Sequence, residues 1–101
     1  MNRASYMWTV MKAATRKGET DDAVKEQLVQ HVCENAPRGD VDLAIKLIDE
    51  FASTTSFLMN IGDEKGELLD EVVKQSAPKR AVELGAFCGY SGLRIANKSG
   101  R

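Results

Sequence analysis

The chain has 101 residues, of which 43% are hydrophobic and 29% are charged, and its formal net charge is -1. This composition is typical of one soluble globular domain or part of one, and it disfavours an intrinsically disordered chain. The near-neutral charge gives no general attraction to nucleic acid or to an anionic membrane, so neither is an expected partner. Cys33 and Cys88 form no C-x-x-C pair, which indicates neither a zinc site nor a disulfide framework and favours a reducing, cytoplasmic setting.

Residues 1–19 differ from the rest of the chain and are interpreted as a variable basic leader. The first 18 residues contain no acid, and their basic residues are Arg3, Lys12, Arg16 and Lys17. Apolar residues at helical spacing indicate an amphipathic helix: Ala4, Met7, Trp8 and Met11. The apolar stretches are too short for a secretory signal or a transmembrane segment. A mitochondrial presequence and a surface-packed first helix are both open alternatives.

Three helices are predicted between the leader and Pro78. Thr20, Asp40 and Asp63 each stand where an N-cap residue would stand, because a short polar side chain there can accept from a free backbone amide. The second helix has the clearest apolar stripe, at helical spacing without a gap: Ala44, Leu47, Ile48, Phe51 and Ala52. Pro78 is expected to end the third helix.

A buried strand is predicted at Arg80 to Leu84, followed by a glycine-bearing loop and a helix with Ser91 as its N-cap. A strand that leads into a helix in this way is the first half of a βαβ unit. One strand cannot form a sheet, because its backbone groups would have no partners. We therefore expect an α/β domain that is truncated after Arg101. Residues 20–101 would be its N-terminal part, and this part would be mostly helical.

The loop does not carry a standard phosphate-binding motif. Its glycines, Gly85, Gly89 and Gly92, do not match G-x-G-x-x-G, and the chain has no G-x-x-x-x-G-K-[ST]. A helix that begins near Ser91 can still offer amides and a hydroxyl to a carboxylate, and Glu83 can face an amine. A zwitterion that carries an aromatic base would fit both groups. The open alternative is that Glu83 pairs with a basic neighbour and Ser91 only caps its helix.

Two runs of sequence resemble one known family. VELGAFCGYSGLRIA is very similar to the first motif of catechol O-methyltransferases, and FLMNIGDEKGELLDEVV resembles the segment that precedes that motif. The two runs agree with the family in order and spacing, and the similarity extends from about Gly18 to Ala96. The resemblance implies the N-terminal part of a Rossmann-like methyltransferase fold: the cap helices, the first strand and the start of the next helix.

The resemblance also implies roles for individual residues around S-adenosylmethionine. Ile61 would give a backbone contact, Ser91 would hold the methionine carboxylate, and Glu83 would lie beside the amino-acid part of the cofactor. The other cofactor-binding positions are Asn60, Gly85, Ala86, Phe87 and Tyr90. Phe57 and Met59 would contact the substrate. Phe57 stands where the family usually has a tryptophan and Phe87 where it usually has a tyrosine, so the identity of the phenolic substrate stays open.

The family transfers a methyl group from sulfonium to a catechol oxygen, with Mg²⁺ chelating both hydroxyls and a lysine as base. The resemblance places the metal ligands and this lysine beyond Arg101, so no catalytic or metal-binding residue is expected in this chain. The implied parent is a cytoplasmic enzyme of catecholamine metabolism that acts on a small catechol or related phenol, and the chain alone is expected to be inactive. The alternative is a naturally short, non-catalytic helical module that binds a protein partner.

Overall fold

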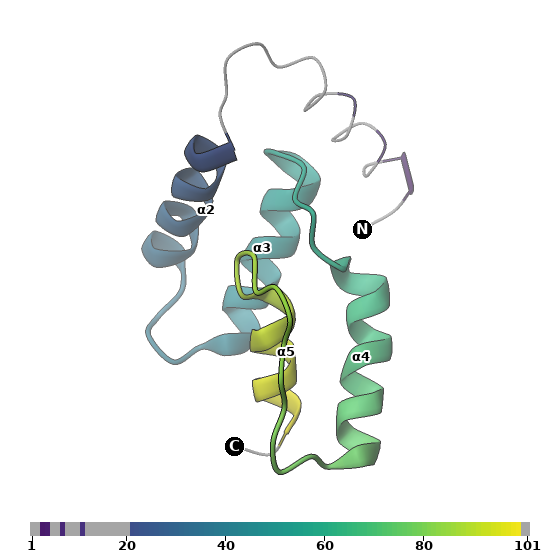
Figure 1. The fold of residues 1–101 in the computed structure, drawn as a ribbon. Helices are drawn as coiled ribbons and strands as arrows, with labels where there is room; N and C mark the ends of the chain where they lie inside the picture. Colours follow the sequence, from purple (N-terminus) through teal and green to yellow (C-terminus); the bar gives the residue numbers. More distant parts are fainter. Residues whose placement is uncertain (1–2, 5–6, 8–10, 12–20, 100–101) are drawn as a thin grey trace. The chain divides into compact units, whose positions relative to one another are not determined.

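The computed structural model describes residues 3–4, 7, 11 and 21–99 (Figure 1). The helices named in it are α2 (Asp21–Asn35), α3 (Val41–Thr54), α4 (Gly62–Ser76) and α5 (Tyr90–Lys98). The chain divides into two compact units between Met59 and Asn60. Thr20 and most of the basic leader lie outside the described residues, so the predicted cap at Thr20 stays a prediction.

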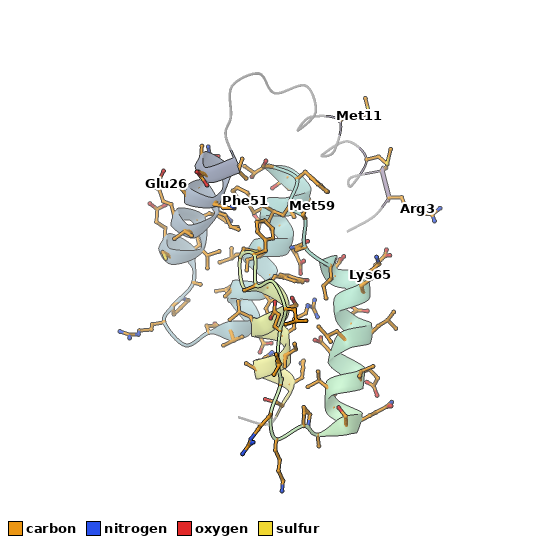
Figure 2. All side chains as sticks on the ribbon, in the orientation of Figure 1. Arg3, Met11, Glu26, Phe51, Met59 and Lys65 are labelled. Carbon is orange, nitrogen blue, oxygen red and sulfur yellow. The ribbon has the colours of Figure 1, made fainter. Side chains whose placement is uncertain are left out.

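In the first unit, α2 packs against α3 through the apolar stripe predicted for α3. Four of its five members are buried and Ala44 is partly buried, and the other buried apolar residues among those described in this unit are Ile45, Leu28 of α2 and Leu58. The ring of His31 on α2 lies 5.9 Å from the ring of Phe51, which Figure 2 labels on α3. His31 is therefore a packing residue of the α2–α3 pair.

The start of α3 is the local feature that the sequence predicted best. Asp40 is its N-cap, and the Asp40 Oδ1 accepts a hydrogen bond from the Leu43 amide at 3.0 Å. Gly39 precedes it with φ of 91°, which closes a tight turn in which the Asp40 amide donates to the Pro37 carbonyl at 3.1 Å. The turn separates α2 from α3 and lets the two helices pack side by side.

In the second unit, α4 is followed by an extended segment, a loop and α5. Figure 1 shows the chain turning back after α4 as an extended trace and then reversing through a loop into α5. α5 packs on α4, with Tyr90 and Arg94 buried on α5 and with Gly66 and Val73 buried on α4. Ala77 ends α4 in the left-handed region, with φ of 43°, and Pro78 follows as predicted.

The prediction that Asp63 is the N-cap of α4 is wrong. The helix begins at Gly62 with Ile61 in the cap position, and no side chain makes a capping bond among the described residues. Asp63 lies inside the first turn, where its Oδ1 accepts from the Glu64 amide at 3.0 Å. Gly62 has φ of 76°, a backbone conformation that glycine adopts easily, and this turns the chain into the helix before Asp63.

The prediction of a buried strand at Arg80 to Leu84 is also wrong for the structure. No strand occurs among residues 21–99, and Val82 and Leu84 are 87% and 94% exposed. A strand exists only through hydrogen bonds to a second strand, and the described residues provide none. The mostly helical character is confirmed, whereas the sheet of the expected α/β fold does not occur in this part of the chain.

Candidate functional site

The loop between the extended segment and α5 is a tight reversal. Gly85, Phe87 and Gly89 have φ of 83°, 48° and 82°, and the Gly89 amide donates to the Ala86 carbonyl at 2.8 Å. Glycine adopts such angles without the steric penalty that a side chain brings, and Phe87 adopts one despite its side chain. The reversal brings the end of the extended segment back to the start of α5.

The first turn of α5 begins earlier than predicted. Tyr90 is the first helical residue and Gly89 is in the cap position, so the prediction that Ser91 is the N-cap is wrong. Ser91 is instead the second residue of the helix. No side chain caps this turn among the described residues. The first amides of a helix have no carbonyl partner within it, and together they carry a partial positive charge.

Glu83 and Ser91 meet at this turn. The Ser91 hydroxyl donates to Glu83 Oε1 at 3.0 Å, and both residues are partly buried. A Cβ atom on Gly92 would lie 2.9 Å from Glu83 Oε2, so the missing side chain leaves space for the carboxylate. The partner that the structure shows for Glu83 is therefore the Ser91 hydroxyl, not the basic neighbour of the alternative.

This pair places two complementary groups within one hydrogen bond of each other. The Glu83 carboxylate can accept from an ammonium group, and the first amides of α5 can donate to a carboxylate. The single proton of the Ser91 hydroxyl goes to Glu83 here, so this hydroxyl can donate to a ligand carboxylate only after it turns away from Glu83. The α-amino and α-carboxyl groups of an amino acid are separated by a single carbon. The arrangement is therefore suited to the zwitterionic end of an amino-acid ligand.

Tyr90 does not offer its side chain at the surface. It is only 2% exposed, and its hydroxyl accepts a hydrogen bond from Arg94 Nε at 3.1 Å. The sequence analysis did not foresee that the phenol of Tyr90 accepts a hydrogen bond from Arg94, and its role in a ligand site stays a prediction.

The other predicted site residues fall into two groups. Gly85, Ala86 and Phe87 are exposed in the loop, next to the Glu83 and Ser91 pair in the chain. Asn60 is partly buried, and Ile61 is 38% exposed at the cap position of α4. Phe57 and Met59 belong to the first unit, where Phe57 is partly buried and Met59 is 81% exposed. Among these residues the structure shows a direct contact between Glu83 and Ser91, and the roles of all the predicted site residues stay predictions.

Gly92 and Arg94 also belong to this region, and the sequence analysis assigned no contact to either of them. Arg94 is 7% exposed and pairs with Asp70 of α4, with 2.5 Å between Nη1 and Oδ2. The available signal was Gly66, an isolated glycine inside the helical pattern of α4, where alanine would form the helix better.

The described residues were also searched for metal and membrane features. Among the described residues, no group of three or more His, Cys, Asp or Glu side chains could hold a metal ion. None of the described helices has the length and apolar character needed to cross a membrane.

Comparison with known proteins places the chain beside methyltransferases. The model of a family described as O-methyltransferase matches residues 22–99. A probable O-methyltransferase of Mycobacterium tuberculosis is 43% identical over 82 residues, which cover 81% of this chain and 35% of that protein. Catechol O-methyltransferase B of Danio rerio is 45% identical over 71 residues, covering 70% of this chain and 27% of that protein.

The catechol O-methyltransferase of Bos taurus is 35% identical over 95 residues, which cover 93% of this chain and 35% of that protein. The chain thus spans about a third or less of the length of these curated relatives, between 27% and 35%. No solved structure gives a significant match to it.

Proposed function

This chain belongs to the O-methyltransferase family, and we propose that it forms part of the S-adenosylmethionine site of a catechol O-methyltransferase. The resemblance noted from its two sequence runs is confirmed by the family match and by catechol O-methyltransferases among its relatives. The family supports an enzyme that transfers methyl groups to oxygen. The cofactor, the catechol and the Mg²⁺ are parts of the proposal.

The observation that carries the proposal is the hydrogen bond between Ser91 and Glu83 at the start of α5. S-adenosylmethionine ends in a free amino acid, and the site supplies an acceptor for its ammonium group and donors for its carboxylate. The sulfonium of the bound cofactor supplies the methyl group. The residues of this chain hold and orient the amino-acid end, and Gly85 keeps the loop backbone in a conformation that places Glu83 beside the helix.

The remaining predictions about the parent protein are retained as parts of the same proposal. The extended segment at residues 80–84 would be the first strand of a Rossmann-like sheet, which would cover the exposed Val82 and Leu84. Residues 20–101 would be the N-terminal part of one methyltransferase domain after a basic leader at residues 1–19. The free Cys33 and Cys88 suit a reducing compartment such as the cytoplasm.

Binding of S-adenosylhomocysteine to the ¹⁵N-labelled chain tests the proposal. We expect saturable shifts of the backbone amides of residues 90–93, with weak affinity because the chain holds only part of the site. Ser91→Ala should weaken binding about tenfold, since a hydrogen bond to a charged group contributes about 1.5–3 kcal/mol.

Ser99→Ala is the matched control, because the Ser99 hydroxyl donates to the Ala96 carbonyl at the opposite end of the same helix. It should leave the affinity unchanged. Glu83→Gln should also weaken binding, because the ammonium group loses its charged partner while the side chain keeps its shape. Equal affinities for Ser91→Ala and Ser99→Ala, or no shifts in the wild-type chain at millimolar ligand, would contradict the proposal.

A further inference from the structure

Arg94 joins the two helices of the second unit through a buried guanidinium group. Its Nη1 lies 2.5 Å from Asp70 Oδ2, and the exposed fractions of the two side chains are 8% and 15%. Its Nε donates to the Tyr90 hydroxyl at 3.1 Å, and its Cζ lies 5.2 Å from the centre of the Tyr90 ring. One side chain of α5 is therefore fixed both to α4 and to the first residue of its own helix.

Gly66 allows this guanidinium to lie directly on the backbone of α4. A Cβ atom built on Gly66 would lie 2.9 Å from Arg94 Nη2 and closer still to Nε and Cζ. Alanine is the better helix former at an interior position, so the glycine is explained by this close approach and not by local helix preference. The guanidinium of Arg94 thus has a defined binding position on α4, formed by the backbone at Gly66 and the carboxylate of Asp70.

The contacts of Arg94 with Gly66 and Asp70 fix the rotation of α5 about its own axis. Tyr90 and Arg94 are four residues apart and share one face of the helix, while Ser91 follows Tyr90 by about 100° around the axis. The hydroxyl of a serine lies about 4–5 Å from the helix axis, so a rotation of about 20° would move it by about 1.5 Å. Such a movement would break the 3.0 Å hydrogen bond between Ser91 and Glu83.

We propose that Arg94 is a positioning residue for cofactor binding, which orients the first turn of α5 through Asp70, Gly66 and Tyr90. This inference rests on the proposed function, because it assigns the start of α5 to the amino-acid end of S-adenosylmethionine. Arg94 itself does not touch the ligand. A buried ion pair often adds little net stability compared with apolar side chains, but its fixed geometry can specify one arrangement.

The test uses the full 101-residue chain and three variants: Arg94→Met, Asp70→Asn and Arg80→Met. Arg80→Met is the matched control, because Arg80 is an exposed arginine of the same unit. Titration with S-adenosylhomocysteine gives the Kd, and residual dipolar couplings give the directions of the N–H bonds of residues 91–93. A side chain that only stabilises the fold would leave these directions unchanged in the molecules that remain folded.

We expect Arg94→Met to raise the Kd at least tenfold and to change the couplings of residues 91–93, with no such changes in Arg80→Met. A Kd within twofold of the wild-type value would overturn the proposal, whatever the couplings show. If Arg94→Met loses its cooperative melt, Asp70→Asn is judged by the same two criteria, because it removes only the charge that holds the guanidinium. If the wild-type chain binds no ligand, the proposed function fails separately, and unchanged couplings then overturn the positioning role.

Discussion

Replacing Gly66 by alanine should lower the free energy of unfolding, because Arg94 packs on this glycine. Gly66 is an interior residue of α4 with no positive φ, so its backbone suits alanine. In an unobstructed helix this replacement stabilises by about 1 kcal/mol. Here the added methyl group would meet the guanidinium of Arg94, whose Nη2 would be 2.9 Å away.

The structure allows two responses, and both reduce the free energy of unfolding. If α4 and α5 move apart, the cost is that of an overpacked core, about 1–3 kcal/mol. If the guanidinium of Arg94 moves away from α4, the largely buried carboxylate of Asp70 loses its charged partner. This loss costs up to about 3–5 kcal/mol for a fully buried pair and less here. The less costly response determines the result, so after subtracting about 1 kcal/mol for helix preference we expect a net loss of up to about 2 kcal/mol.

The same replacement in an Arg94→Ala background should have the opposite sign. With the guanidinium absent, the new methyl group has space, and Gly66→Ala should stabilise by about 1 kcal/mol relative to Arg94→Ala alone. Urea unfolding of the four proteins gives the coupling energy, and hydrogen exchange of the α4 amides reports the second unit specifically.

Lys65→Ala is the control for this cycle, because Lys65 is an exposed neighbour on α4, labelled in Figure 2. Its effect should be small and equal in both backgrounds. The reasoning is refuted if Gly66→Ala changes the free energy of unfolding by the same amount in both backgrounds, within about 0.5 kcal/mol, since independent sites are additive to that level.

Other predictions concern single positions and the chain as a whole. Asp40→Ala should destabilise by about 1 kcal/mol in urea unfolding, because the Leu43 amide loses its cap, and Asp40→Asn should not. Ala77→Gly should raise the melting temperature by relieving the left-handed conformation at φ of 43°, and an unchanged or lower value would contradict the assigned conformation. The chain alone should show no methyl transfer to a catechol with Mg²⁺ present, so measurable turnover would contradict the placement of the catalytic groups elsewhere. The alternative of a helical binding module requires a cooperative thermal melt, and a non-cooperative melt would exclude it.

Local chemistry made α3 predictable from the sequence. An α-helix closes its hydrogen bonds within four residues, and its cap needs only a polar side chain at the correct position, as at Asp40. The starts of α4 and α5 were misplaced because Gly62 and Gly89 adopt positive φ. Glycine permits this conformation but does not require it, so the residue type alone did not reveal where Asp63 and Ser91 would fall.

The prediction of a strand at Arg80 to Leu84 was wrong for a different reason. Apolar residues with high β-propensity, such as Val82, indicate which side chains a strand would bury. The strand itself forms only when it hydrogen-bonds to a second strand, which can come from any part of a protein. In the described residues this segment is extended and exposed. Sequence pattern predicted the character of the segment, and the absence of a paired neighbour among these residues decided its structure.

By itself, the sequence determined the family and the approximate positions of the helices between Asp21 and Lys98, because each depends on residues close together in the chain. The tertiary structure alone decided that Arg94 meets Asp70, since this contact joins positions 24 residues apart and Gly66 by itself does not indicate which side chain packs on it. It also decided that Tyr90 turns its phenol toward Arg94. Helix packing selects one rotation of α5 on α4, and that rotation determines which side chains are buried and which can reach a ligand.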